Sequence, residues 1–272
     1  MLPNKYISSV QNPLVKKAIL LKEKSRERKK SGLFLLEGVR ELQLATKALY
    51  EIETVFYCDA ILENTSDQAF IKSFAADILI SVSKEVYKKL AHRDTTEGIV
   101  AIAKGKEHAL SDFGFNSKNP IILVAEAPEK PGNIGALLRT ADAANLDAVL
   151  IANPKTDLYN PNVIRSSVGC LFSRTVRTGT STAIIAFLKS KGFHIYCAAL
   201  TASKVYTDVN FSGPTAIVVG TEHDGLSEEW LRNSTQNIII PMEGEIDSMN
   251  VSVSAAILIF EAKRQHKSIQ DG

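Results

Sequence analysis

Short apolar segments alternate with longer amphipathic ones along the second half of this 272-residue chain, and this alternation limits the folds it can adopt. The apolar segments predict strands at Ile121–Ala125, Ala148–Ala152, His194–Ala199, Ala216–Val219 and Ile238–Ile240. The segments between them predict helices near Ala136–Asn145, Asn162–Val168, Thr182–Lys191, Ser227–Asn233 and Met249–Gln265. Apolar strands separated by helices are typical of a mainly parallel sheet that helices cover on both faces.

The first hundred residues repeat this alternation. Asn12-Pro13 supplies a helix N-cap and a proline at the first helical position. Short apolar segments predict strands at Leu33–Leu36, Thr54–Cys58, Ile78–Val82 and Gly98–Ala103. Residues 105–119 lose the periodicity and gain small polar residues, which is typical of a linker. We therefore expect one α/β domain over residues 1–104 and a second over residues 120–272.

Composition favours a cytoplasmic protein without a membrane segment or a metal site. No apolar run approaches the ~18 residues that cross a bilayer, and the first residues lack the apolar core of a secretory signal. Cys58, Cys170 and Cys197 are far apart in the sequence and lack metal-ligand spacing. We interpret them as buried, reduced thiols.

Positive charge is concentrated at the N-terminus. Residues 1–30 carry nine basic residues against two acidic ones, a net charge of +7 on a chain whose total charge is +2. The basic residues are Lys5, Lys16, Lys17, Lys22, Lys24, Arg26, Arg28, Lys29 and Lys30. This distribution fits either a localised contact with a polyanion or a solvated helix face.

Glycines and prolines follow the predicted strands of the second domain. Pro131-Gly132-Asn133-Ile134-Gly135 follows the first strand, Gly220 the fourth and Pro241-Met242-Glu243-Gly244 the fifth. Ligands of open parallel sheets bind beyond the carboxyl ends of the strands, and glycine lets the backbone approach a ligand closely. The sequence contains neither the Gly-x-Gly-x-x-Gly fingerprint nor a Gly-Lys-Ser/Thr phosphate loop. The pattern predicts a small-ligand crevice built mainly of main chain.

Three segments sharpen this prediction. They are Asn133–Ala141, Val219–Ser227 and the run from Ile240 through Ser252. In order and residue type they resemble the signature motifs of the SpoU/TrmH-type RNA 2'-O-ribose methyltransferases, a branch of the SPOUT superfamily. The resemblance implies an α/β fold whose C-terminal, mainly parallel sheet is tied into a deep trefoil knot. It further implies that S-adenosyl-L-methionine binds in the knot loops and that a ribose 2'-hydroxyl of RNA is methylated.

The resemblance also implies which residues hold the cofactor. Gly220 matches the glycine of the second motif, and Ile240 and Met249 match apolar positions whose backbone holds the adenosyl group. Met242 and Ser248 lie in the same stretch as Met249 and complete the expected cofactor site.

Arg139 matches the arginine that the family assigns to the 2'-hydroxyl. A guanidinium has a pKa above ~12 and is a poor base. We therefore expect Arg139 to stabilise the developing alkoxide, with Glu222 orienting it through a charge-assisted pair. Asn133 and Asn250 are expected to fix the ribose and a phosphate in the same crevice.

The first domain is similar to the ribosomal-protein-like α/β domain that often accompanies this family. The similar stretches are Ile7–Pro13, Phe34–Arg40 and Thr95–Ala101. The resemblance implies an RNA partner, with ribosomal RNA favoured. Because phosphate contacts dominate affinity for nucleic acids, the basic residues Lys16, Lys17, Lys22, Arg26 and Arg28 are expected to bind RNA. In the second domain, Arg165–Phe172 resembles the Arg-Ala-Ser-x-Gly-Ala segment of the family, which implies that Arg165 also contacts RNA phosphate.

The last predicted helix is apolar on two sides. Val253, Ile257 and Phe260 share one face, and Val251, Ala255, Leu258 and Ala262 share another. A helix of this kind is buried on two sides, either because a second copy of the chain covers one of them or because the helix is central to its own domain. For the homodimer we expect Leu258 on the outer face.

Two other functions stay open at this point. One is methylation of transfer RNA, and the other is a non-catalytic RNA-binding or ribosome-assembly role. The intact set of Asn133, Arg139, Glu222 and Asn250 argues against the non-catalytic role. A hydrolase that uses His223, Asp224 and Ser227 is disfavoured because the sequence has no nucleophile elbow.

Overall fold

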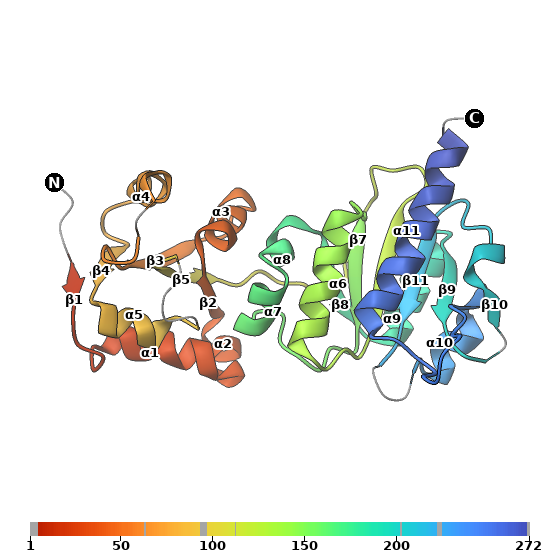
Figure 1. Ribbon diagram of the computed structural model, residues 1–272, viewed down its shortest axis with the longest axis horizontal. Coiled ribbons are helices and arrows are strands. Elements are labelled where there is room, and N and C mark those ends of the chain that lie inside the picture. Colours follow the sequence, from red (N-terminus) through yellow and green to blue (C-terminus); the bar gives the residue numbers. More distant parts are fainter. Residues whose placement is uncertain are drawn as a thin grey trace. The chain divides into compact units, whose positions relative to one another are not determined.

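The computed structural model describes residues 5–62, 64–92, 97–111, 113–201, 203–221 and 225–270, which form two compact units (Figure 1). Unit 1 consists of Met1–Glu107 together with Asp157–Ser173, and unit 2 of His108–Thr156 together with Arg174–Gly272. The first boundary falls inside the predicted linker. Asp157–Ser173, which the sequence assigned to the second domain, is grouped with unit 1 instead.

Unit 1 is built on a five-stranded mixed sheet. In spatial order the strands are β1 (Tyr6–Ile7), β4 (Leu79–Val82), β3 (Ile52–Tyr57), β5 (Ile99–Lys104) and β2 (Leu33–Glu37). β5 runs antiparallel to both β3 and β2, whereas β1, β4 and β3 are parallel. The N-terminal helices are α1 (Pro13–Glu23), α2 (Ser25–Ser31), α3 (Val39–Lys47), α4 (Thr65–Lys72) and α5 (Lys84–Leu90). The four strands that the sequence predicts here are all present.

Helix α1 begins as its sequence predicts. The Asn12 side chain accepts a hydrogen bond from the Leu14 amide at 2.9 Å, and Pro13 is the first helical residue. Val15, Ala18 and Leu21 are buried in the core of unit 1. The lysines of α1 lie outside this apolar stripe. When the stripe is buried, most of the positive charge of the helix therefore stays at the surface.

An aromatic cluster joins the returning segment to β2. Two short helices, α7 (Pro161–Ser166) and α8 (Cys170–Ser173), make up most of this segment. The Tyr159 ring stacks on Phe34 with 4.3 Å between centroids, and Phe172 packs edge-on against Tyr50. The Tyr159 hydroxyl accepts from the Lys106 amide at 2.7 Å and lies 3.2 Å from the Tyr50 hydroxyl. These rings make Asp157–Ser173 part of the core of unit 1.

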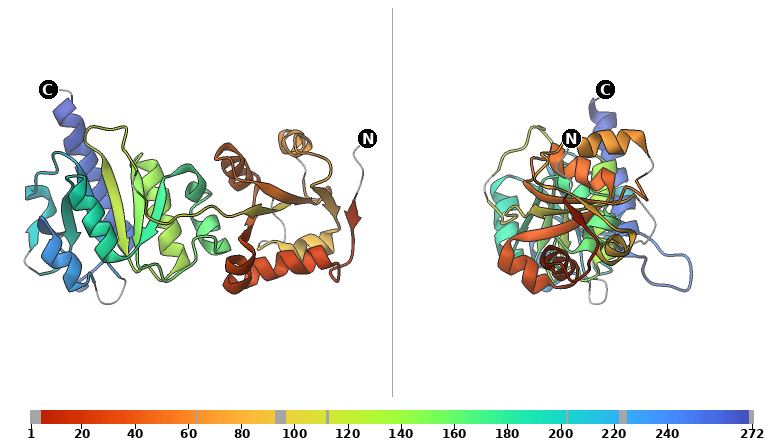
Figure 2. Two further views of the ribbon diagram at one scale, coloured as in Figure 1. Left: turned by 180° about the vertical axis from the view of Figure 1, so that it is seen from behind. Right: turned by 90° about the vertical axis from the view of Figure 1, so that its left-hand side faces the viewer.

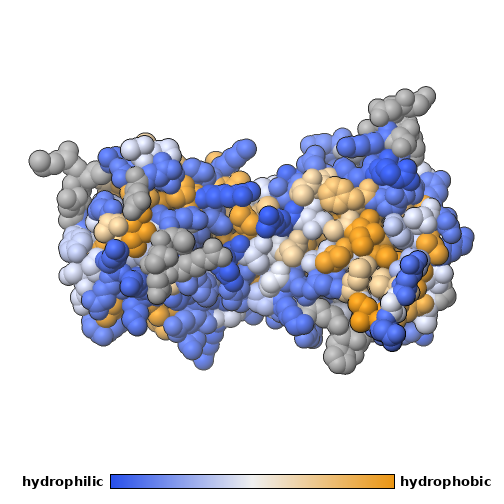
Figure 3. All heavy atoms as spheres, in the orientation of Figure 1, coloured by the Kyte–Doolittle hydropathy of each residue, from blue (hydrophilic) through white to orange (hydrophobic). Residues whose placement is uncertain are grey.

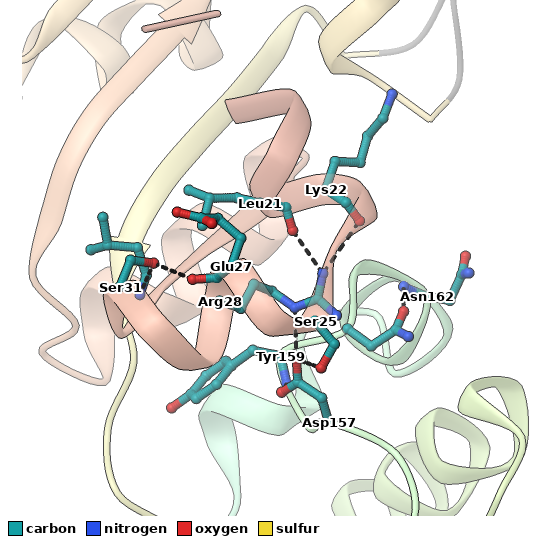
Figure 4. A network of polar contacts seen from close by, with 11 residues as sticks. Leu21, Lys22, Ser25, Glu27, Arg28, Ser31, Asp157, Tyr159 and Asn162 are labelled. Atoms are coloured by element: carbon teal, nitrogen blue, oxygen red, sulfur yellow. Dashed lines mark hydrogen bonds and ion pairs between the residues drawn. The ribbon is translucent and has the colours of Figure 1, made fainter. Parts of the chain in front are cut away.

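A buried ion pair joins the same segment to α2. The Arg28 Nε lies 2.7 Å from Asp157 Oδ2, and the two side chains are only 4% and 13% exposed (Figure 4). Arg28 Nη1 also donates to the carbonyl of Leu21 at 2.7 Å, and Ser25 Oγ donates to Asp157. The expectation that Arg28 contacts RNA is therefore wrong, because its side chain is buried and its Nε and Nη1 are hydrogen-bonded within unit 1.

Unit 2 contains a seven-stranded sheet in which every described pair of neighbours is parallel. In spatial order the strands are β10 (Ser203–Val205), β12 (Gln236–Ile239), β9 (His194–Ala198), β11 (Thr215–Val219), β6 (Ile121–Glu126), β7 (Ala148–Ala152) and β8 (Val176–Gly179). The sequence predicts five of these strands. It misses β8 and β10, which are short and contain Arg177 and Lys204.

Helices cover both faces of the sheet, as predicted. On one face, α6 (Pro131–Ala143) lies against α11 (Val251–Gln270), and α11 packs on β6 and β11 (Figure 1). On the other face, α9 (Ser181–Ser190) packs against α10 (Glu228–Asn233) (Figure 2). The fully buried Trp230 of α10 belongs to the apolar core of this second face.

The order of the strands creates a switch point between β6 and β11. From β6 the chain proceeds to β7 and β8 on one side, then crosses to β9 and returns to β11 on the other. The register pairs Ile121 with Thr215 and Ala125 with Val219, so both strands end at the same edge. Open parallel sheets bind ligands at this position.

Helix α11 is apolar on two sides, but Leu258 lies on the inner one. Leu258 and Ile259 are buried within unit 2, whereas Val253 and Phe260 are 47% and 51% exposed. The expectation that Leu258 faces outward is wrong. The outer apolar face consists of Val253, half-buried Ile257 and Phe260.

No helix in the described part of the chain is long and apolar enough to cross a membrane. Within those same residues, no group of three or more His, Cys, Asp or Glu side chains could hold a metal ion. Cys58, Cys170 and Cys197 are buried free thiols.

Asp157→Ala should destabilise unit 1, because it leaves the Arg28 guanidinium buried without its counter-charge. We expect a loss of about 3 kcal/mol in the free energy of unfolding, measured by urea titration. The control is Glu53→Ala, which breaks the Lys17–Glu53 pair, whose side chains are 41% and 36% exposed. That change should cost at most about 1 kcal/mol. Equal losses in the two variants would contradict a structural role for the buried pair.

Candidate active site

Two motif residues that are 117 positions apart in sequence meet beside the sheet edge. Asn250 Nδ2 donates to Asn133 Oδ1 at 3.1 Å. Asn133 lies in the first turn of α6, and Asn250 immediately precedes α11. The hydrogen bond therefore ties the start of one helix to the start of the other. The expected convergence of Asn133 and Asn250 is present in the structure.

Asn250 also caps α11. Its Oδ1 accepts from the Ser252 amide at 2.9 Å and from Ser252 Oγ at 2.6 Å. A side-chain oxygen at this position satisfies a backbone donor that has no partner within the helix. The carboxamide therefore uses its oxygen for the helix and its nitrogen for Asn133.

Arg139 lies on α6, six residues beyond Asn133, with an exposed side chain. Six residues correspond to a rise of about 9 Å along the helix axis. Helical side chains tilt toward the helix N-terminus, where Asn133 lies, and six residues also turn Arg139 about 120° around the axis from Asn133. The expected partner of Arg139, Glu222, falls outside the described residues, so the pair between them stays a prediction.

Gly220 directly follows β11 at the switch point, where the loop folds back on itself. The Thr221 amide and Oγ1 both donate to the Gly225 carbonyl, at 3.3 and 3.1 Å. A Cβ at Gly220 would lie only 2.6 Å from the Gly225 carbonyl carbon and from the Leu226 nitrogen. The expectation from sequence was that glycine is needed here to approach a ligand. In the structure, the close approach of the loop's own backbone already requires it.

The remaining expected cofactor residues lie between β12 and α11. Ile240, Met242 and Met249 are half-buried, and Ser248 is exposed. The stretch from Pro241 to Asn250 contains neither helix nor strand. Partly exposed apolar side chains beside a non-regular backbone suit a ligand that has a flat apolar ring and polar edges.

The expected RNA-binding residues all lie in unit 1, in differing environments. Lys16, Arg26 and Arg165 are exposed. Lys17 is 3.2 Å from Glu53, and Lys22 Nζ donates to the carbonyls of Lys89 and Ala91.

A small cavity in unit 1 brings Lys22 and Arg165 near a histidine that sequence reasoning missed. The cavity has a volume of about 10 Å³, and its lining includes Lys22, Glu37, His92 and Arg165. The His92 amide donates to Glu37 Oε2 at 2.6 Å. Burial lowers the pKa of His92, Glu37 opposes this, and the nearby charges of Lys22 and Arg165 lower it further. No periodicity or motif marks His92, because its neighbours come from distant parts of the sequence.

Comparison with known proteins decides the family. Residues 120–260 match the model described as the SpoU rRNA Methylase family, over a span that includes Asn133, Arg139, Gly220 and Asn250. The chain belongs to the SpoU family. Residues 12–101 match the MRM3-like substrate binding domain.

Relatives of this SpoU protein match along most of its length. A 23S rRNA (guanosine(2553)-2'-O)-methyltransferase, RlmP of Bacillus subtilis, is 28% identical over 95% of this chain and 99% of its own. The 23S rRNA (guanosine-2'-O-)-methyltransferase RlmB of Shewanella oneidensis is 31% identical over 72% of this chain and 82% of its own.

Solved structures agree with the fold of the SpoU protein. The crystal structure of an RNA 2'-O ribose methyltransferase is 38% identical, with a TM-score of 0.85, over 96% of this chain and 99% of that one. An AdoMet-bound rRNA methyltransferase from Sinorhizobium meliloti is 25% identical, with a TM-score of 0.85, over 96% of this chain and 97% of that one.

Two substitutions of Asn250 should separate its two roles. Asn250→Asp keeps an oxygen that caps α11 but removes the donor to Asn133, so the free energy of unfolding should change by less than about 0.5 kcal/mol. Asn250→Ala removes both interactions and should cost about 1 to 2 kcal/mol. Urea titration of unit 2 measures both values. Equal losses would mean that the Asn133 contact, and not the cap, stabilises this end of α11.

Proposed function

We propose that this protein is an RNA 2'-O-ribose methyltransferase that uses S-adenosyl-L-methionine and acts on ribosomal RNA. The observation that carries the proposal is the hydrogen bond between Asn133 and Asn250, which brings the first and third motifs together beside the switch point. Membership of the SpoU family supports the same activity. The names of RlmP and RlmB, both 23S rRNA methyltransferases, support the choice of ribosomal RNA.

The residues at the sheet edge fit the cofactor. Ile240, Met242 and Met249 offer partly exposed apolar surface, and Ser248 adds a hydroxyl. Gly220 leaves room for the backbone of Gly225 and Leu226 to pack against it. S-adenosyl-L-methionine supplies an electrophilic methyl group on a sulfonium sulfur when it is bound. The chain's own part is to enclose and orient this group and to prepare the ribose hydroxyl.

Arg139 is the proposed catalytic residue. When a 2'-hydroxyl attacks the methyl group, a carbon–oxygen bond forms as the carbon–sulfur bond breaks, and the electron pair of the broken bond stays on sulfur. The hydroxyl proton passes to water or to a phosphate, and negative charge develops on the oxygen as the proton leaves. A guanidinium stabilises such a charge without giving up a proton of its own. Asn133 and Asn250, held together by their side chains, supply amide groups that can orient the ribose and a neighbouring phosphate.

Methyl transfer to purified ribosomal RNA and to transfer RNA tests the substrate. We expect incorporation into ribosomal RNA only, at a ribose 2'-oxygen. Incorporation into transfer RNA alone would favour that substrate instead. Absence of both cofactor binding and transfer would favour the non-catalytic role.

Arg139→Ala should lower the rate of methyl transfer by a factor that corresponds to about 3 to 4 kcal/mol, as for other single electrostatic stabilisers. The affinity for S-adenosyl-L-methionine, measured by calorimetry, should change little, because Arg139 acts mainly on the transition state. Arg174→Ala is a control on a cation elsewhere in unit 2, where Arg174 pairs with Asp142. A fully active Arg139→Ala enzyme would contradict the assignment.

The proposed RNA-binding surface of unit 1 excludes Arg28 and centres on the exposed cations. These include Lys16, Lys24 and Arg26 on or beside α1 and α2, and Arg165 on α7. Lys22 and Arg165 also line the small cavity with His92. Such a distribution suits contacts with the phosphates of structured RNA, which proteins recognise largely by shape and backbone.

Replacing Lys16, Lys24 and Arg26 by Gln should weaken RNA binding and reduce the slope of log affinity against log salt. Each lost phosphate contact should lower the slope by nearly one. S-adenosyl-L-methionine affinity should not change, because its proposed site lies in unit 2. An unaltered salt slope would identify the three residues as a solvated face.

We further propose that the protein is a homodimer that uses the outer face of α11. Val253, Ile257 and Phe260 form this face. Figure 3 displays a continuous apolar area on unit 2, in the region where α11 and α6 lie. Exposed apolar patches of this kind are commonly interaction sites. The resemblance to the SpoU/TrmH-type enzymes supports both this dimer and a trefoil knot in unit 2. A cytoplasmic location is proposed as well, and the buried free thiols fit it.

Phe260→Asp should convert the dimer to monomers, because it puts a charge on the apolar face in place of its most exposed aromatic side chain. Light scattering measures the molar mass, which should fall to that of one chain. The rate of methyl transfer should also fall if each active site needs both subunits. Lys204→Glu is the control, since Lys204 is exposed on the edge strand β10 and lies outside α11. A fully active monomer would show that the dimer is not required.

A further inference from the structure

Glu126 is a buried carboxylate to which the proposed mechanism gives no role. It is the last residue of β6 and is only 5% exposed. Its Oε2 accepts from the Ser227 amide at 2.8 Å, and its Oε1 accepts from Ser227 Oγ at 2.7 Å and from Ser181 Oγ at 3.1 Å. Burying a carboxylate is unfavourable unless hydrogen bonds compensate for lost water. The three donors supply that compensation.

The donors come from two connections that are far apart in the sequence. Ser181 is the first residue of α9, and Ser227 directly precedes α10. The Ser181 hydroxyl also accepts from Trp230 Nε1 and from Asn153 Nδ2, each at 2.9 Å. Glu126 is thus the acceptor at the centre of a network that joins the ends of β6 and β7 to the starts of α9 and α10.

Ser227 also ends the loop that begins at Gly220. Close to Gly220, Thr221 donates twice to the Gly225 carbonyl, which draws the two arms of the loop together. Leu226 is buried, and the next residue is held by Glu126 through both its amide and its hydroxyl. Gly220 and Thr221 are therefore held by β11, and Ser227, which follows Gly225 and Leu226, is held by Glu126.

We propose that Glu126 is a positioning residue that holds Ser227, and with it the Gly225–Leu226 backbone that packs against Gly220, in place for cofactor binding. It acts through Ser227 and does not itself touch the cofactor or the RNA. This inference rests on the proposed function, since it assigns the loop to the cofactor site. The carboxylate suits this task because both oxygens only accept, and each faces a donor. A carboxamide in the same place would turn an NH₂ group, which only donates, toward the Ser227 amide or toward the serine hydroxyls that now donate to Glu126.

The test compares Glu126→Gln, which preserves shape, with Glu129→Gln, an exposed glutamate three residues further along the chain. Glu126→Gln should raise the KM for S-adenosyl-L-methionine about tenfold or more, as for loss of a buried charge-assisted hydrogen bond. The KM for RNA should stay within twofold of the unmodified enzyme. Glu129→Gln should leave both values unchanged. A Glu126→Gln enzyme with an unaltered KM for the cofactor, whatever its stability, would overturn the inference.

Ser227→Ala provides a second measurement that does not depend on the folding of the Glu126 variant. It removes the hydroxyl donor but keeps the amide donor, so the KM for the cofactor should rise by a smaller factor in the same direction. In the double variant the two effects should not multiply, because both act on one contact. Independent, multiplying effects would overturn the proposed route through Ser227.

The outcomes also separate this inference from the proposed function. If the unmodified enzyme neither binds S-adenosyl-L-methionine nor methylates RNA, the proposed function fails. If the unmodified enzyme does both and the Glu126 and Ser227 variants keep its cofactor KM, only the positioning role fails.

Discussion

The parallel register of β6 and β11 is the constraint on which the rest of unit 2 depends. Because Ala125 pairs with Val219, the two strands end together. Glu126, the last residue of β6, and Gly220, the first residue after β11, therefore lie at the same edge of the sheet. An antiparallel pairing would place these two residues at opposite edges of the sheet. The motifs can act together only because the crossover through β7, β8 and β9 returns the chain to β6 in parallel.

Unit 1 depends on a different interaction, the buried contact of Arg28 with Asp157. An arginine within a run of basic residues is indistinguishable in sequence from its solvated neighbours. What separates Arg28 is its position on the inner side of α2, where Asp157 and two main-chain carbonyls surround it. Residues 1–30 do carry an excess of positive charge, but one of these charges, that of Arg28, is buried and stabilises unit 1.

The sequence predicted the architecture well where periodicity or motifs were strong. Apolar runs located five of the seven strands of unit 2, and the three motifs brought Asn133 and Asn250 into one site before any contact was known. The failures have physical reasons. β8 and β10 are too short and too polar to show a periodic pattern. Leu258 lies on a helix with two apolar sides, and periodicity alone does not tell which of the two sides faces the core. Glu126 owes its proposed role, and His92 its surroundings, to partners from other elements, which spacing along the chain does not encode.

The return of Asp157–Ser173 to unit 1 has a consequence for how this architecture can be recombined. The chain passes between the units three times, after Glu107, Thr156 and Ser173. A chimera that exchanged only the N-terminal stretch would leave Tyr159 and Phe172 facing a foreign β2, and Asp157 without Arg28. Exchange of RNA specificity between relatives therefore requires a matched insert within the methyltransferase half, so the two halves of the gene are expected to diverge together rather than to be shuffled as independent modules.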